Sequence, residues 1–243
     1  MFRGKTYWII GASEGLGREL AYQLGISGAN LILSARNEAR LHDLAASLNN
    51  ASPLQLDVSD RSSVSRACAD LPPVDGVIYC AGSYDPMAAK DWHADAFETM
   101  AAVNFLGAAR VLGNILPNFI ERNRGHVVLI GSLAGFRGLP SAIGYGATKA
   151  ALMHLAENIY ADLRGTGVTV QIINPGFIKT RLTRKNSFHM PQIMPADEAA
   201  RHVLRAMKSK RFSTSFPRPF AWLFTWGRFL PSALFYRLFP RTR

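Results

Sequence analysis

Short apolar segments alternate with helical patterns along most of the chain. The apolar segments are rich in aliphatic and β-branched residues, as buried strands of a parallel sheet are. The expected strands are 5–10, 30–34, 54–56, 76–79, 126–130 and 168–173, and the expected helices run to about 25 and over about 37–48, 60–70, 93–102, 104–122, 145–164 and 196–209. Repeated strand–helix units predict an α/β fold with a doubly wound parallel sheet.

The length and composition suit one such domain. A chain of 243 residues with 48% hydrophobic residues can enclose a full core. We expect the domain over 1–215, followed by an extension over 216–243. Cys68 and Cys80 are the only cysteines, and no secretory signal opens the chain, so a reducing, cytoplasmic setting is expected. The six histidines are scattered without metal-ligand spacing, so no metal site is expected.

A glycine-rich turn follows the first expected strand. Gly11, Gly15 and Gly17 give the spacing G-x-x-x-G-x-G, and Ser13 and Leu16 lie between them. A strand, a glycine turn and a helix start together form a phosphate-binding layout, because free backbone N–H groups and the helix dipole favour an anion. The alternative is that the glycines only allow tight packing. The strand–helix context favours phosphate binding.

The end of the second expected strand indicates which dinucleotide is bound. NAD sites commonly have an acid about 20 residues past the glycines, which holds the ribose hydroxyls. This chain has Arg36 there instead, and a guanidinium suits the additional phosphate of NADP. The alternative is a solvated arginine at a helix start, and the nearby acid Glu14 counts mildly against NADP. We expect NADP(H).

Three residues between 126 and 149 could move a proton. Ser132 lies just past the strand 126–130, and Tyr145 and Lys149 are four residues apart, on one face of the expected helix. A nearby ammonium stabilises phenolate and lowers the pKa of a tyrosine, and a serine hydroxyl can hydrogen-bond a substrate oxygen. Such a set could protonate a carbonyl oxygen while a hydride reaches its carbon. The Tyr-x-x-x-Lys spacing alone could arise by chance.

Together these motifs resemble the short-chain dehydrogenase/reductase family over roughly residues 4–215. The matching residues are the glycines 11, 15 and 17; Asp57 with Val58 near the adenine; Ala81 and Gly82; the tetrad Asn104, Ser132, Tyr145 and Lys149; and Pro175, Gly176, Ile178 and Thr180 on the nicotinamide side. Two residues depart from the family pattern: Ile10 replaces a common Thr, and Cys80 replaces an Asn. The resemblance implies a Rossmann fold.

The family also implies roles for the tetrad. Tyr145 would be the general acid in reduction and the base in oxidation, with its pKa lowered by Lys149, which also holds the nicotinamide ribose. Ser132 would orient the substrate oxygen, and Asn104 would help to anchor a proton-relaying water. The implied activity is NADP(H)-dependent hydride transfer to or from a carbonyl or alcohol carbon. The alternatives are a 3-oxoacyl thioester reductase whose basic segment 179–185 docks a carrier protein, and a non-catalytic NADP-binding sensor or membrane scaffold.

The C-terminal part carries most of the charge. Residues 1–178 hold 14 Lys and Arg against 15 Asp and Glu, whereas residues 179–243 hold 14 against two. The segment 181–194 contains methionines and suits a lid over a lipophilic substrate, or else a surface loop. The extension 216–243 has nine aromatic residues, five arginines and no acid. It either lies on an anionic membrane surface or covers the cleft or a partner subunit. We expect a homodimer or homotetramer and no nucleic-acid partner.

Overall fold

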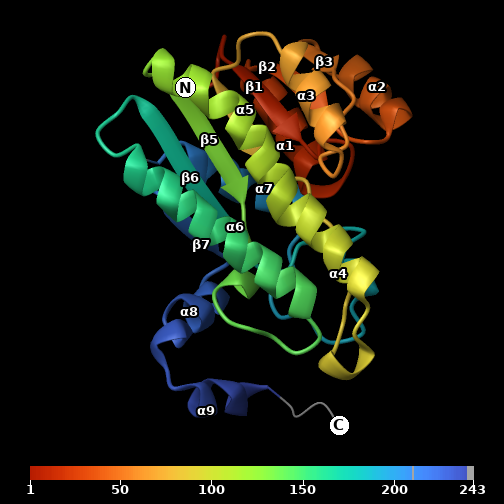
Figure 1. Cartoon of the computed structure of the whole chain (residues 1–243), viewed down its shortest axis with the longest axis vertical. Coiled ribbons are helices and arrows are strands. Elements are labelled where there is room, and N and C mark those ends of the chain that lie inside the picture. The colour runs from red at the N-terminus through yellow and green to blue at the C-terminus, as the bar shows by residue number, and fades with distance from the viewer. Residues whose placement is uncertain (210, 240–243) are drawn as a thin grey trace.

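The computed structural model describes residues 1–209 and 211–239, and within them the chain forms one seven-stranded sheet (Figure 1). The strands are β1 (Thr6–Ile10), β2 (Asn30–Ser34), β3 (Ala51–Pro53), β4 (Gly76–Tyr79), β5 (Gly125–Ile130), β6 (Val168–Pro175) and β7 (Ser213–Phe216). Their order is β3-β2-β1-β4-β5-β6-β7, and every neighbouring pair is parallel. The predicted doubly wound parallel sheet is confirmed.

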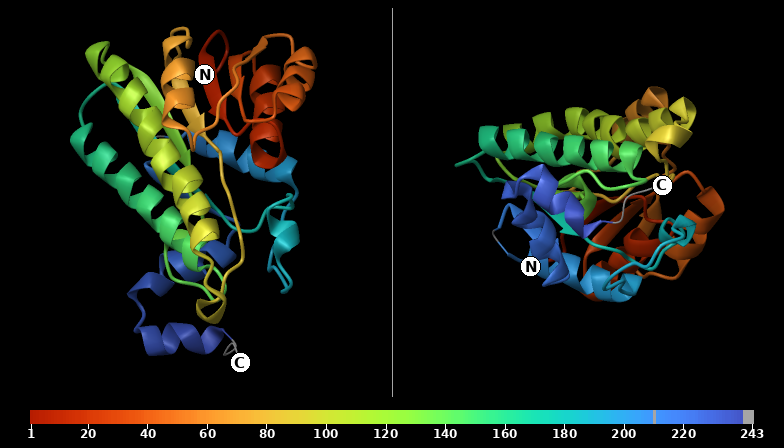
Figure 2. Two further views of the ribbon diagram at one scale, coloured as in Figure 1. Left: turned by 45° about the vertical axis from the view of Figure 1, so that its right-hand side comes forward. Right: turned by 90° about the horizontal axis from the view of Figure 1, so that it is seen from below.

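Helices cover both faces of the sheet (Figure 2). The helices are α1 (Gly15–Ile26), α2 (Glu38–Ala46), α3 (Arg61–Ala69), α4 (Ala94–Ala101), α5 (Gly107–Glu121), α6 (Ile143–Asp162) and α7 (Ala196–Met207). Side chains of α1, α2 and α7 share one core cluster with Tyr7 and Ile9, whereas those of α3, α5 and α6 share the other with Trp8 and Ile10. The alternation along β1 follows from the period of two in a strand. Both faces are buried, which explains the continuous apolar strands.

The predicted third strand at 54–56 is wrong by three residues. The strand is Ala51–Pro53, and Leu54 and Leu56 continue beside β2, with their amides donating to Leu33 and Ala35 at 2.8 and 3.1 Å. The prediction followed the apolar residues Leu54 and Leu56, of which Leu56 is buried. The true strand, Ala-Ser-Pro, is short and has no apolar run. A proline is tolerated here because β3 is an edge strand.

The seventh strand was not expected, because its sequence, Ser-Thr-Ser-Phe, lacks an apolar run. It pairs with the end of β6 through the register Pro175↔Phe216, so the expected domain boundary at 215 falls just inside β7. The two helical patterns expected at 93–102 and 104–122 are α4 and α5, which a π-helical turn (Ala102–Leu106) joins into one run.

This joined run, Ala94–Glu121, has 28 residues and is long and apolar enough to cross a membrane by length and composition alone. In the structure it supplies core side chains such as Val111 and Phe119 to the packing against the sheet. We interpret it as a core helix, because core helices pass the same test.

The extension continues from β7 as two short helices, α8 (Phe220–Thr225) and α9 (Ser232–Phe235). They lie together at the end of the molecule opposite the N-terminus (Figures 1 and 2). Ala221, Phe224 and Phe235 form a small separate core with Leu133, which follows β5. The extension therefore packs on the loop next to Ser132. Arg241 and Arg243 lie outside the described residues.

Candidate active site

A cleft of about 710 Å³ opens where the sheet strands end. It is lined by residues that directly follow β1, β2, β4 and β5 and by the end of β6, the edge at which α/β sheets bind ligands. All the predicted cofactor residues line it: Gly11, Ser13, Gly15, Leu16, Gly17, Arg36, Asp57, Val58, Ala81, Gly82, Tyr145, Lys149, Pro175, Gly176, Ile178 and Thr180. Ser132 lines it as well. Seventeen residues chosen from separate motifs thus meet in one cavity.

The glycine turn has the backbone that a phosphate cradle needs. Gly11 and Gly15 have positive φ angles of 89° and 56°, which other L-residues rarely adopt. A Cβ on Gly17 would lie 2.1 Å from the carbonyl oxygen of Gly11, so only glycine lets α1 start this close to the strand. The turn leaves the N-terminus of α1 open to the cleft, and its geometry suits the pyrophosphate of a dinucleotide.

Arginines gather at the same end of the cleft. Arg36 and Arg40 both line it. Arg40 contacts the Glu14 carboxylate at 3.3 Å, whereas Arg36 has no ion-pair partner among the residues that the structure describes. Hydrogen bonds and charge from Arg181 and Arg40 hold the pKa of Glu14 below its usual value. Glu14 is therefore ionised, and the two arginines balance its negative charge. This charge does not exclude a phosphate near Arg36.

Ser132, Tyr145 and Lys149 come from two neighbouring elements. Ser132 begins the turn after β5, and its Oγ accepts a hydrogen bond from the amide of Ala134 at 3.2 Å. Tyr145 and Lys149 lie one turn apart in α6, and the Lys149 ammonium lies 5.7 Å from the centre of the Tyr145 ring. Lys149 Nζ donates to the carbonyl oxygen of Ile130 at 2.8 Å. This bond fixes the lysine at the end of β5.

The pKa of Tyr145 is raised, whereas the sequence predicts that it is lowered. Burial raises the pKa of Tyr145, and hydrogen bonding with the Ser132 hydroxyl only partly opposes it. The expected lowering by Lys149 is not found: burial and the neighbouring Cys80 raise this pKa, and the opposing contribution comes from Ser132. Burial also lowers the pKa of Lys149 to about 8 and raises the pKa of the neighbouring Cys80 to about 12. The phenol and the thiol are thus protonated at neutral pH.

Asn104 does not line the cleft but supports its wall. It is fully buried in the π-helical turn between α4 and α5. Its side-chain amide donates to the carbonyl oxygen of Ser83 and to the hydroxyl of Thr148, both at 2.9 Å, and accepts from the Ser83 amide at 2.7 Å. π-helical turns are frequent at functional sites. Asn104 therefore joins the loop after β4 to α6, and its role in anchoring a water stays a prediction.

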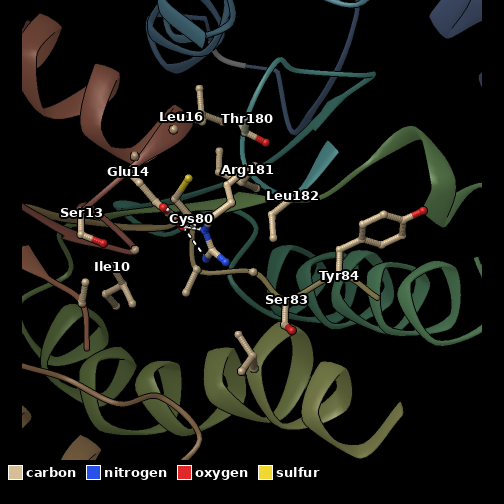
Figure 3. A pocket seen from close by; sticks show the side chains of 18 of the residues that line it. Ile10, Ser13, Glu14, Leu16, Cys80, Ser83, Tyr84, Thr180, Arg181 and Leu182 are labelled. Atoms are coloured by element: carbon tan, nitrogen blue, oxygen red, sulfur yellow. Dashed lines mark hydrogen bonds and ion pairs between the residues drawn. The ribbon is translucent and has the colours of Figure 1, made fainter. Parts of the chain in front are cut away.

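Sequence reasoning missed the residues that close the mouth of the cleft. Tyr84 packs edge-on against Tyr145, with ring centres 5.0 Å apart, and its hydroxyl donates to Asn186 at 2.6 Å. Arg181 contacts Glu14 (Figure 3), and Lys185 contacts Asp85 at 3.3 Å. No local pattern signals these contacts, because they join residues that are 61 to 167 positions apart. They tie the segment 181–186 to both sides of the opening.

Comparison with known proteins identifies the family. The sequence model of the family described as short chain dehydrogenase matches residues 5–190, which contain the glycine turn and the Ser132, Tyr145 and Lys149 set. The chain belongs to this family. The resemblance seen in the sequence is thus confirmed.

Similar members of the short-chain dehydrogenase family are oxidoreductases by name. An uncharacterized oxidoreductase of Myxococcus xanthus is 35% identical over an alignment of 239 residues, which covers 95% of this chain and 94% of that protein. An uncharacterized oxidoreductase of Staphylococcus epidermidis is 32% identical and covers 84% of this chain and 90% of its own length. We therefore describe this short-chain dehydrogenase as an oxidoreductase.

Solved structures share the fold. Serine dehydrogenase in its closed form with NADP+ has a TM-score of 0.80 at 25% identity, covering 87% of this chain and 94% of that one. A short-chain dehydrogenase of Burkholderia cenocepacia in complex with NADP has a TM-score of 0.89 at 24% identity, covering 99% and 100%. The second likeness includes the C-terminal extension and shows the fold alone.

Proposed function

We propose that the protein is an NADP(H)-dependent oxidoreductase that transfers a hydride between the nicotinamide and a carbonyl or alcohol carbon. The observation that carries this proposal is one cleft lined both by the glycine turn with Arg36 and by Ser132, Tyr145 and Lys149. Dinucleotide-binding and proton-transferring groups thus face the same space. The cofactor when bound supplies the hydride in reduction, or accepts it in oxidation.

The chain's own residues have distinct roles in this proposal. The glycine turn would hold the pyrophosphate, Arg36 the additional phosphate, and Asp57 the adenine side. In reduction, the Tyr145 phenol gives its proton to the substrate oxygen. Its raised pKa keeps that proton in place at neutral pH. The Ser132 hydroxyl steadies the same oxygen as negative charge develops on it.

The substrate is proposed to be lipophilic. Tyr84, Val103 and Leu182 are apolar or aromatic residues that line the cleft, and Tyr84 packs against Tyr145. The methionines of the lid do not contribute, because Met194 is buried in a core cluster and Met190 contacts Asn186. The support therefore comes from aromatic and aliphatic walls. For such a substrate we propose a cytoplasmic enzyme that associates with a membrane face.

Reduction of a carrier-bound 3-oxoacyl thioester is less well supported. In this alternative the basic segment 179–185 docks an acidic carrier protein. Arg181 and Lys185 are instead paired with Glu14 and Asp85, and only Lys179 and Arg184 lack an acid partner among the described residues. A non-catalytic sensor is also less well supported, because the chain retains Ser132, Tyr145 and Lys149.

The test compares wild type with Tyr145→Phe on a panel of lipophilic ketones, with NADPH oxidation and NADPH binding measured separately. The variant removes only the proton donor, so turnover should fall about 100-fold or more, with NADPH affinity unchanged. Tyr160→Phe, at an exposed tyrosine of the same helix, is the control. Equal turnover by wild type and Tyr145→Phe would reject the proposed catalysis.

A further inference from the structure

The outer face of the C-terminal extension gathers exposed apolar side chains. Of the fifteen large hydrophobic residues that are exposed in the described chain, seven lie between 222 and 238. They are Trp222, Trp226, Phe229, Leu230, Leu234, Tyr236 and Leu238, of which Tyr236 also bonds inward to the domain through its hydroxyl. Trp226 and Phe229 are 70% and 69% exposed. A concentration of this kind marks a contact surface, because single exposed hydrophobic residues are otherwise scattered.

The extension is fixed to the domain, so this face has a defined orientation. Its inner residues Phe224 and Phe235 are buried. The Arg137 guanidinium lies over the Phe235 ring, 4.7 Å from its centre, and donates to the carbonyl oxygen of Leu230 at 3.2 Å. The Tyr236 hydroxyl donates to Gly138 at 3.2 Å. These contacts leave the opposite side of α8 and α9 facing away from the sheet (Figure 2).

The charged side chains of the extension that the structure describes are all arginines. Arg218, Arg228 and Arg237 are exposed, and the sequence holds no acid after Glu198. The Arg228 guanidinium lies 4.7 Å from the centre of the Phe229 ring, so a cation accompanies the most exposed aromatic residues. Bulky apolar side chains interleaved with arginines are the composition of helices that lie in an anionic lipid interface.

A second copy of the chain complements this face less well. A symmetric contact brings the same patch of both copies together. Here such a contact would oppose arginines to arginines, with no carboxylate in the extension to neutralise them. The helices of the extension are also too short to span a bilayer. α8 and α9 have six and four residues, whereas a membrane span needs roughly 20.

We propose that the exposed face of residues 220–239 docks on the surface of an anionic membrane. Trp222, Trp226, Phe229 and Leu230 would enter the interface, while the arginines lie at the headgroups. The docking assigns a surface to the membrane association proposed above and does not depend on the reaction. Because the inner side of the extension packs on Leu133, docking would place the Ser132 loop close to the lipid.

The test is sedimentation of the full-length protein with vesicles of phosphatidylcholine alone or mixed with phosphatidylserine. Wild type should bind the anionic vesicles at least about 10-fold more strongly, and salt should weaken this binding because it screens surface charges. The double variant Trp226→Ser, Phe229→Ser should lose most binding, and Arg228→Gln should lose part of it. Trp92→Ser, at an exposed tryptophan of another region, is the matched control.

Two results would overturn the proposal. Equal binding by wild type and the double variant would show that this face does not contact lipid. Absence of vesicle binding by wild type, with an oligomer that the double variant converts to monomer in light scattering, would assign the face to a second copy. Turnover is measured on the same samples without vesicles, so failure of docking and failure of the proposed reaction are distinguishable.

Discussion

Glu14 and Arg181 form an ion pair across the mouth of the cleft, although 167 positions separate them in the sequence. Arg181 donates to Glu14 Oε1 from both Nη2 and Nε, at 2.6 and 2.9 Å. One partner belongs to the glycine turn and the other to the segment that follows Thr180. The pair therefore joins the expected phosphate cradle to the segment 181–194, the proposed lid.

Arg181→Ala is expected to speed the release of NADPH several-fold without much loss of stability. Exposed ion pairs contribute only about 0–1 kcal/mol to folding. The substitution should therefore change the rate at which the proposed lid opens more than it changes the free energy of unfolding. Stopped-flow fluorescence of NADPH measures the release rate. Arg184→Ala is the matched control, since this exposed neighbour has no acid partner among the described residues. Unchanged release from Arg181→Ala would show that the pair is not a gate.

Arg36→Ala is expected to weaken NADPH binding by about 1.5–3 kcal/mol, the range for hydrogen bonds to a charged group. NADH lacks the additional phosphate, so its affinity should hardly change. Calorimetry with both cofactors measures the difference, with Arg66→Ala, outside the cleft, as the control. NADH binding to wild type as tight as NADPH binding would contradict the cofactor proposal.

Lys149→Met is expected to stabilise the protein at pH 7 by about 1–3 kcal/mol while abolishing turnover. Burial lowers the pKa of Lys149 from 10.5 to about 8, so below pH 8 the fold carries a charge that it disfavours. The gain should fade as the pH rises from 8 to 10.5, where unfolded chains also lose the proton. Thermal unfolding at pH 7 and pH 10 measures this. A variant less stable than wild type at pH 7 would contradict it.

Asn104→Ala is expected to destabilise the fold by about 1–3 kcal/mol, since it leaves partners at Ser83 and Thr148 without their hydrogen bonds. Asn114→Ala is the control, because this asparagine is exposed and bonds only within its own helix. Urea unfolding measures both variants. If the two variants have equal stability, the side chain of Asn104 does not brace the cleft.

The fold was largely predictable because a parallel sheet buries both faces. A strand such as β5 contains a continuous apolar run, Val127 to Ile130, and the glycine that follows it marks its end. This signal fails at the sheet edges. At β3 the apolar Leu54 and Leu56 lie beyond the strand, and at β7 the pairing depends on backbone hydrogen bonds to β6 rather than on side-chain pattern.

The candidate site was predictable where each motif is local. The glycine turn and the Tyr145–Lys149 pair each lie within one short segment, and strand ends bring them together. Contacts between distant segments, such as Tyr84 with Asn186, leave no local pattern. The direction in which the pKa of Tyr145 shifts could not be predicted either, because it depends on burial, and the spacing of residues in the sequence does not determine burial.

The position of β1 inside the sheet, between β2 and β4, has a consequence for the growing chain. β1 is synthesised before both of its neighbours, and it pairs with β2 on one side and with β4 on the other. Its second edge stays without a partner until residues 76–79 have left the ribosome. The glycine turn is thus made early, but the cleft around it closes only after Lys149 and Thr180 exist. A nascent chain that stops before β5 has a nucleotide-binding sequence and no place for a substrate.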